Sequence, residues 1–293
     1  MRVRSISAIG IVLAGLIPAF LGGPVFAALM IALGIAAWRE YVVIVTQVVA
    51  HPLPRWLSGI GAVAIGVIGL GAYRDIGAVG LIAVTFAAVV LTLAAIMSER
   101  ERVPSMLSWA MMVSGVVYLG LPVFCAVALR QTALPLDSDW IDAVAELTPV
   151  TWPLAAYGLA WTLVIVLTTW IGDTAALLGG RRFGRRPLAP GISPNKTLEG
   201  AIVGLAGSSV VAALTYSATG LGAVWVGALA GVVLGAFGQF GDLTESFFKR
   251  QAGLKDSGAF IPGHGGVLDR IDALLFTFPL GYILSSLSLW WPT

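Results

Sequence analysis

Acidic and basic residues are concentrated in one stretch of an otherwise apolar sequence, GDLTESFFKRQAGLKDSGAFIPGHGGVLDRID, residues 241–272. Charges of both signs are costly beside lipid unless a polar site requires them. Carboxylates hold Mg²⁺ together with substrate phosphates, and charge neutralisation is the main requirement of phosphoryl or nucleotidyl transfer. The stretch therefore predicts a site for a metal-bound, anionic ligand. Its acids are Asp242, Glu245, Asp256, Asp269 and Asp272, and its bases are Lys249, Arg250, Lys255 and Arg270.

The first part of this stretch has the spacing of a helix face. If the preceding apolar helix continues through it, Asp242, Glu245 and Lys249 share a face, with Ser246 and Arg250 beside them. Salt bridges within the helix are the structural alternative. Two acids and two bases at the end of a span instead favour a metal site next to a phosphate site.

Glycines dominate the second part, from Gly258 to the PGHGG segment at 262–266. Such turns expose backbone N–H groups, which form concave anion-binding sites. We expect Gly265 and Gly266 to contribute to one. His264 has no apolar neighbours to pack against, which favours a phosphate contact or a proton-carrying role over a place in a core.

Asp269 and Asp272 stand three residues apart at the start of the last apolar segment, where they would share a helix face. Acids at a helix start also stabilise the helix dipole, which is the structural alternative. Arg270 would point aside from this pair.

A further carboxylate, Asp173, ends an otherwise apolar helix. An unpaired acid there is costly, and a metal or a basic partner would relieve the cost; the alternative is a helix-end carboxylate wetted by the interface. Four arginines follow between residues 181 and 186. They are explained by membrane topology alone or by attraction to anionic headgroups.

The segment SPNKTLEG, residues 193–200, combines a proline-containing turn with a helix start. Thr197 is expected to cap the helix that begins near Leu198. Ser193, Asn195 and Lys196 would then lie beside a helix N-terminus, where free N–H groups favour anions. Ordinary loop chemistry accounts for Ser-Pro-Asn, whereas the lysine favours phosphate binding.

The composition excludes an ordinary soluble domain. Of the 293 residues, 58% are hydrophobic and 11% are charged, whereas soluble domains carry about 25% charged residues. We therefore predict an all-α, polytopic integral membrane protein. The basic N-terminus and its apolar run are interpreted as a first helix rather than a cleaved signal peptide. The lone Cys125 is expected to be a buried hydrophobe.

Apolar segments long enough to span a bilayer number about nine. A polar break is expected at Arg39-Glu40, followed by a short interfacial or packed helix. The first expected span covers roughly 6–21, and the second follows the Gly22-Gly23-Pro24 turn and ends near 38. The others cover roughly 57–73, 76–97, 106–129 and 152–171, and three more start near 198, 221 and 268.

The distribution of charge predicts the orientation. With nine spans, 15 of the 17 lysines and arginines fall on one side, and only Arg74 and Arg130 fall on the other, which carries the acidic loop DSDWIDAVAE. The positive-inside rule then places the N-terminus and the polar loops in the cytoplasm.

The two parts of the chain differ in their polar content. Residues 1–150 carry only isolated, flanking charges, so we interpret helices 1–5 and the following loop as scaffold. Residues 151–293 carry all three polar clusters and are interpreted as the catalytic region. Taken together, the clusters predict a metal-dependent enzyme acting on a phosphorylated substrate at the cytoplasmic face. P-loop, HExxH and serine hydrolase motifs are absent from the sequence.

The residues of 246–272 closely resemble the motif of the phosphatidate cytidylyltransferases (CDP-diacylglycerol synthases), S-x-x-K-R-x4-K-D-x-G-x3-P-G-H-G-G-x2-D-R-x-D, at every fixed position. The upstream ISPNKTLEG is similar to the family's SPKKTWEG but departs at Asn195 and Leu198. Asn195 removes a cation and so puts one phosphate contact in question. The family's tyrosine shortly after the Asp173 position is replaced by Ala176-Leu177.

This resemblance implies that CTP and phosphatidic acid give CDP-diacylglycerol and pyrophosphate, with Mg²⁺ and a possible second cation. The implied metal ligands are Asp173, Asp242 and Asp269. The implied catalytic residues are Lys249, Arg250, Lys255, Asp256, His264 and Asp272, and the implied substrate-binding residues are Ser193, Asn195, Lys196, Ser246, Gly265, Gly266 and Arg270.

The resemblance also implies a homodimer in the lipid bilayer, and we expect no nucleic acid partner. An enzyme using another lipid phosphate stays open as an alternative. A transporter or flippase for an anionic lipid is the alternative outside enzymes, but it would place charges near the middle of the membrane. A CDP-alcohol phosphotransferase would need a DGxxAR run, which the sequence lacks.

Overall fold

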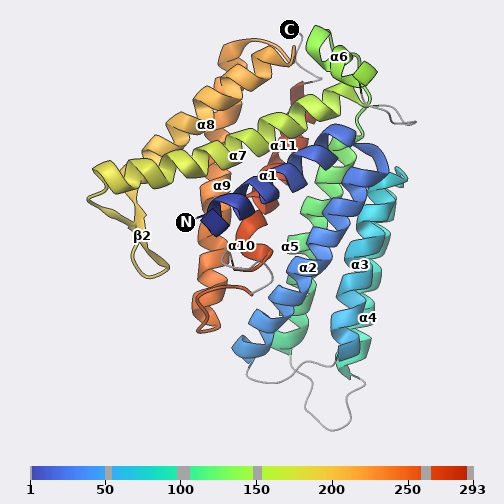
Figure 1. Cartoon of the computed structure of the whole chain (residues 1–293). Helices are drawn as coiled ribbons and strands as arrows, with labels where there is room; N and C mark the ends of the chain where they lie inside the picture. Colours follow the sequence, from blue (N-terminus) through green and yellow to red (C-terminus); the bar gives the residue numbers. More distant parts are fainter. Residues whose placement is uncertain (1, 50–54, 98–105, 148–153, 259–264, 289–293) are drawn as a thin grey trace. The chain divides into compact units, whose positions relative to one another are not determined.

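Long apolar segments become α-helices in this chain because a helix satisfies its own backbone hydrogen bonds where water is absent. The computed structural model describes residues 2–49, 55–97, 106–147, 154–258 and 265–288 (Figure 1). Its elements are α1 (Arg2–Leu21), α2 (Gly23–Val49), α3 (Arg55–Tyr73), α4 (Gly77–Met97), α5 (Met106–Arg130), α6 (Asp139–Leu147), α7 (Ala156–Phe183), β1 (Pro187–Ala189), β2 (Ser193–Thr197), α8 (Leu198–Ala218), α9 (Val224–Gln251), α10 (Leu268–Ile271) and α11 (Leu274–Ser288).

The predicted all-α membrane class is confirmed. Within the described residues, seven helical segments are long and apolar enough to cross a bilayer, and two shorter apolar stretches, Val12–Leu21 and Gly80–Ala94, lie in α1 and α4. The predicted number of about nine is reached when these two are included. The buried Cys125 side chain also agrees with its predicted role.

Several helix bounds differ from the prediction. The break at Arg39-Glu40 was wrong, because α2 runs unbroken from Gly23 to Val49 and carries both charges within it. Asp173 does not end its helix, since α7 continues for ten residues to Phe183. A small antiparallel hairpin, β1–β2, and the short helix α6 were not predicted. Short elements of three to nine residues carry too weak a periodic signal to be recognised in a sequence.

The chain folds into two compact units, each made of separate sequence segments. Unit 1 contains residues 1–26, 129–247 and 272–293, and unit 2 contains residues 27–128 and 248–271. This division by packing does not coincide with the expected boundary near residue 150. The division of labour between a scaffold and a catalytic region concerns activity and stays a prediction.

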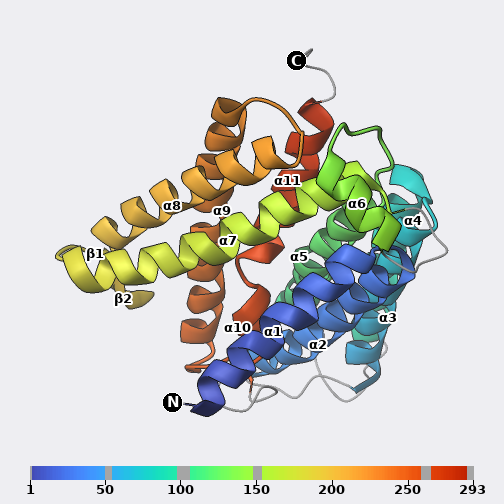
Figure 2. The same cartoon turned by 45° about the horizontal axis from the view of Figure 1, so that its top comes forward.

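In unit 1, α7 and α8 lie side by side along their length, as both views show (Figures 1 and 2). Small residues allow this close approach. A Cβ atom at Gly179 would overlap the side chain of Val203, and one at Gly204 would lie 2.8 Å from the Cβ of Ala176. Small residues at helix contacts are the usual means of packing helices in membranes, where van der Waals contact replaces the hydrophobic effect.

In unit 2, aromatic side chains of α2 fill space left by glycines on neighbouring helices. Trp38 and Tyr41 are buried and stacked, with ring centroids 6.0 Å apart. Gly61 of α3 and Gly115 of α5 face these rings, and a Cβ atom at either glycine would overlap them. The Tyr41 hydroxyl donates to the Met111 carbonyl at 2.9 Å, so its polar end is satisfied as well.

Arg130, one of the two cations on the predicted acidic side, is 1% exposed in unit 1. Its guanidinium donates to the carbonyls of Ala19 at 2.7 Å and Phe20 at 3.2 Å, near the end of α1, and to that of Leu154 at 2.6 Å. Gly22 has φ of +63°, and a Cβ atom there would lie 3.0 Å or less from the guanidinium atoms. Arg130 thus satisfies carbonyls that the helix itself leaves without donors.

Replacing Arg130 with Met should lower stability strongly, because each buried carbonyl left without a donor costs about 1–3 kcal/mol. Thermal unfolding of the detergent-purified protein measures this effect. Arg74→Met is the matched control, since Arg74 is the exposed cation on the same predicted side. An unfolding temperature for Arg130→Met equal to that of the control would contradict this account of Arg130.

Candidate active site

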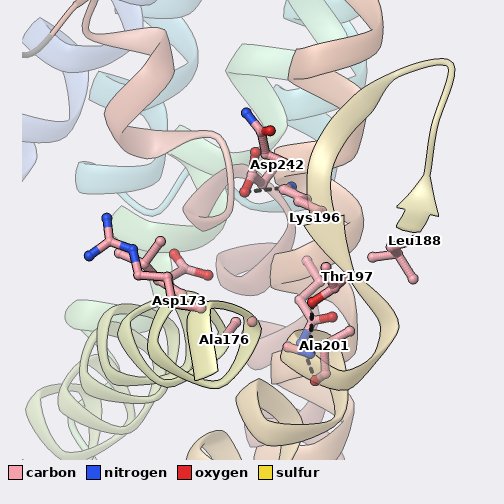
Figure 3. Close-up of a pocket in the computed structure, with 13 residues that line it drawn as sticks. Asp173, Ala176, Leu188, Lys196, Thr197, Ala201 and Asp242 are labelled. Carbon is pink, nitrogen blue, oxygen red and sulfur yellow. Dashed lines mark hydrogen bonds and ion pairs between the residues drawn. The ribbon is translucent and has the colours of Figure 1, made fainter. Parts of the chain in front are cut away.

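A pocket of about 340 Å³ in unit 1 gathers several of the predicted site residues (Figure 3). Its wall is built by α7, the β1–β2 hairpin, the start of α8 and the middle of α9. Four charged side chains line it, namely Asp173, Arg181, Lys196 and Asp242. The structure therefore brings together two predicted metal ligands and two predicted substrate-binding residues, Asn195 and Lys196.

The hairpin is placed at the start of α8 by two local interactions. The Thr197 side chain accepts a hydrogen bond from the Gly200 amide at 3.2 Å, which confirms its predicted role as N-cap. The Glu199 carboxylate accepts from the amides of Arg185 and Arg186 at 2.9 and 3.1 Å, and it pairs with the Arg186 guanidinium at 3.0 Å. These contacts fold the arginine segment back onto the helix start.

Lys196 and Asp242 form an ion pair across the pocket, with Nζ and Oδ2 2.5 Å apart (Figure 3). Asp173 lies on α7 in the same pocket, and the Asp272 carboxylate is close enough to Asp173 and Asp242 to interact with them electrostatically. Carboxylates held near one another repel. Lys196 offsets part of their combined negative charge. A bound cation would offset the remainder.

Glycines next to these acids allow their helices to approach closely. A Cβ atom at Gly241 would lie 2.6 Å from the Asp272 carbonyl, so α9 contacts the backbone of the segment that precedes α11. A Cβ atom at Gly172 would overlap the Ser208 hydroxyl of α8. The acids were predicted from the sequence, whereas these flanking glycines and Gln239 were not. The Gln239 amide donates to the Ala201 carbonyl at 3.0 Å.

The donor set of this pocket suits Mg²⁺ in part. Mg²⁺ binds through one or two carboxylates and completes its coordination with water and substrate phosphates. Asp173 and Asp242 supply carboxylates of this kind. Across the described ranges, no three acidic, histidine or cysteine side chains form a closed metal cage. The pocket therefore fits a metal ion that arrives with a phosphate ligand.

The third predicted metal ligand, Asp269, belongs to a cluster in unit 2. Its Oδ1 atom accepts from Lys249 Nζ at 2.5 Å, and its Oδ2 atom accepts from the amides of Ser257 and Gly266 at 3.0 and 2.9 Å. The Gly266 amide, predicted to hold a phosphate, here binds Asp269. Its phosphate contact stays a prediction and would require the amide to leave this carboxylate.

Glu40, which the sequence analysis left in the scaffold, contacts the same cluster. It is buried in α2, and its carboxylate lies 2.8 Å from the Ser257 hydroxyl. A lone acid in the middle of an apolar helix was the available signal, because such acids in membrane helices are costly and usually functional. The expected helix break at this residue obscured that signal.

The remaining predicted residues are placed as follows. Ser193 and Ser246 are half-buried, whereas Asn195, Lys255, Asp256, Arg250 and Arg270 are exposed. The Arg250 guanidinium donates to the Leu254 carbonyl at 3.4 Å. Gly265 has φ of +80°, a backbone conformation that favours glycine. His264 lies outside the described residues, and the roles of all these residues stay predictions.

Comparison with known proteins supports the resemblance. The model of the Cytidylyltransferase family matches residues 2–288. The chain is 37% identical over 287 residues to phosphatidate cytidylyltransferase 5, chloroplastic, of Arabidopsis thaliana, covering 94% of this chain and 68% of that protein. It is 46% and 48% identical over 128 residues to the phosphatidate cytidylyltransferases of Staphylococcus haemolyticus and Staphylococcus aureus. These two matches cover 43% of this chain and about half, 49%, of each relative.

The fold defines a polytopic helical membrane protein, and its pocket is lined by acidic and basic side chains. The match across nearly the whole chain specifies the family: this chain belongs to the Cytidylyltransferase family. The predicted family membership is thereby confirmed.

The packing of α7 on α8 should be sensitive to a single methyl group at Gly200. A Cβ atom there would lie 2.8 Å from the Ala176 carbonyl and 3.0 Å from the Gly180 Cα atom, both backbone atoms that cannot rotate away. Overpacking costs about 1–3 kcal/mol, which exceeds the gain of about 0.5–1 kcal/mol from replacing a helical glycine. Gly200→Ala should therefore lower the thermal unfolding temperature in detergent.

Gly191→Ala is the matched control for this substitution, because a Cβ atom at Gly191 has no described neighbour within 4 Å. The control should unfold near the temperature of the parent protein. A Gly200→Ala protein that unfolds at or above the parent temperature would show that the two helices are not in close contact at this position.

Proposed function

We propose that this chain catalyses CDP-diacylglycerol synthesis from CTP and phosphatidic acid, with release of pyrophosphate. The supporting observation is that the family match across residues 2–288 includes both acid–lysine clusters. The relatives from Arabidopsis and Staphylococcus are named for the same reaction. Pairs of acids and cations suit this reaction, because two polyanionic substrates must be brought together.

The chemistry places modest demands on proton transfer. A phosphate monoester has a second pKa of about 6, so phosphatidic acid is mostly dianionic at neutral pH. One of its oxygens attacks the α-phosphorus of CTP, the bond from that phosphorus to the β-phosphate bridging oxygen breaks, and pyrophosphate leaves. Since the nucleophile is already ionised, the protein mainly has to position the groups and neutralise charge.

The acids are assigned to metal binding in this proposal. Asp173 and Asp242 would hold Mg²⁺ in the pocket of unit 1, and Asp269 of unit 2 is assigned to metal binding by the family motif. When bound, Mg²⁺ would neutralise phosphate charge and favour departure of pyrophosphate. Asp269 is paired with Lys249 at 2.5 Å, so binding a metal requires this lysine to turn toward another anion.

The cations are assigned to the phosphates. Lys196 and Lys249 each hold a carboxylate that they would exchange for a phosphate oxygen when substrates bind. Arg250, Lys255 and Arg270 are exposed and would bind the attacking phosphate or the leaving pyrophosphate. Asp256 and Asp272 would orient these cations, and His264 would contact a phosphate.

The orientation is part of the proposal. The multi-pass helices place the protein in a membrane, and the excess of basic residues on one side supports a cytoplasmic N-terminus and active site. CTP is then available from the aqueous phase while the acyl chains of phosphatidic acid stay in lipid. A homodimer, implied by the family resemblance, likewise remains a proposal.

Purified protein in detergent should form CDP-diacylglycerol from CTP and phosphatidic acid only when Mg²⁺ is present, and a chelator should abolish the product. Asp242→Asn and Asp269→Asn should each lower the rate by about 10²–10³-fold, as expected when one group that stabilises transition-state charge is lost. Radiolabelled CTP and thin-layer separation of lipid products measure this rate.

Asp139→Asn is the control, because Asp139 is an exposed acid of α6 outside both clusters. It should retain the parent rate. Full activity of the two test variants would retain the reaction and contradict the assignment of these acids. A folded parent that converts neither phosphatidic acid nor other lipid phosphates would contradict the proposed function and favour lipid transport.

A further inference from the structure

Glu40 is an acid within an apolar helix that spans 27 residues, and its side chain reaches a segment 217 residues further along the chain. Its Oε1 atom accepts from the Val267 amide at 2.8 Å, and its Oε2 atom accepts from the Leu268 amide at 2.8 Å. Both residues precede Asp269 directly. The residue is 9% exposed, so these hydrogen bonds replace water as partners of the carboxylate.

Two glycines of the motif leave room for this carboxylate. A Cβ atom at Gly258 would lie 2.7 Å from Oε1 of Glu40, and a Cβ atom at Gly266 would overlap Oε2. A Cβ atom at Gly258 would therefore displace the Glu40 carboxylate, and one at Gly266 would displace that carboxylate and the Ser257 hydroxyl. The glycines that predicted an anion-binding concavity therefore face an anion that the protein itself supplies.

Ser257 connects Glu40 to Asp269. Its hydroxyl oxygen lies 2.8 Å from Oε2 of Glu40 and 3.0 Å from Oδ2 of Asp269. A serine hydroxyl has one proton, so it donates to one carboxylate at a time. Four backbone amides, two for each carboxylate, and Lys249 on Asp269 hold the two acids on either side of this hydroxyl.

We infer that Glu40 is a positioning residue for the reaction: it holds the segment around Ser257 and Gly266–Leu268, and thereby places the Asp269 carboxylate for its proposed role. The inference rests on the proposed function for its catalytic consequence. A carboxylate is required because both of its oxygens accept from backbone amides. A glutamine has one acceptor oxygen and would place an NH₂ group against another N–H donor.

The test compares Glu40→Gln and Glu40→Asp with Asp75→Asn, a control that removes an exposed acid of the same unit. Glu40→Gln should lower kcat by about 10–100-fold, as a small misplacement of reacting groups does. It should also raise the Mg²⁺ concentration needed for half-maximal rate and leave the KM for phosphatidic acid unchanged. Glu40→Asp keeps both acceptors and should give an intermediate kcat.

Hydrogen–deuterium exchange provides a readout that does not depend on activity. Amides in peptides containing Ser257 and Gly266–Asp269 should exchange about tenfold faster in Glu40→Gln, because each lost hydrogen bond to a charged acceptor lowers local protection. Parent-like exchange and kcat would overturn the inference. A lower unfolding temperature with parent kcat per folded molecule would also overturn it, because that result defines a structural role only.

Coupling to Ser257 supplies a second test. If Glu40 acts through this serine, the double variant Glu40→Gln/Ser257→Ala should have a kcat within about threefold of the slower single variant. If the losses in kcat of the two single variants instead multiply in the double variant, the connection between Glu40 and Ser257 is contradicted. Should Glu40→Gln fail to fold, Gly258→Ala takes its place, since its methyl group would displace the carboxylate without removing the charge.

The outcomes separate this inference from the proposed function. A parent protein that makes no CDP-diacylglycerol contradicts the function, and the exchange difference between Glu40→Gln and Asp75→Asn then tests the positioning alone. A parent that is active, with both Glu40 variants equal to it in kcat and exchange, contradicts the positioning alone.

Discussion

Charges inside a bundle of apolar helices must be neutralised by the protein itself, and this constraint determines which segments of the chain meet. Arg130 satisfies carbonyls near the end of α1, Lys196 pairs with Asp242, and Lys249 pairs with Asp269. In each contact the partners are at least 20 residues apart in the sequence. Apolar contacts allow many helix arrangements of similar energy, whereas a buried charge accepts few partners.

The features that the sequence predicted are those that depend on composition or on local spacing. The all-α membrane class follows from hydropathy, and Thr197 as N-cap follows from residue type next to a helix start. The continuation of α9 through residues 242–250, which places its acids and bases on adjacent turns, follows from helical periodicity. The motif at 246–272 was sufficient to predict the family correctly.

Features that depend on distant contacts could not be predicted in this way. Glu40 was interpreted as part of a helix break because a charge beside an arginine usually marks a helix end. Its partners, Ser257 and the amides of Val267 and Leu268, are identified only once the chain is folded. Gly266 was expected to face a ligand, whereas its amide donates to Asp269. The sequence does not show that an acid already binds this turn. Asp173 was placed at a helix end because the apolar run stops there, although α7 continues.

The length of α7 also bears on where the pocket would lie in a bilayer. At about 1.5 Å per residue, Asp173 lies about 26 Å along the axis from the start of the helix at Ala156. The hydrocarbon core is about 30 Å thick, so a span that began at Ala156 and ran along the bilayer normal would bring this acid close to the opposite boundary. At that level, a lipid headgroup and a water-soluble nucleotide would both reach the pocket without either crossing the hydrocarbon. The proposed lipid product would then diffuse sideways while its acyl chains stayed in the leaflet where the substrate began.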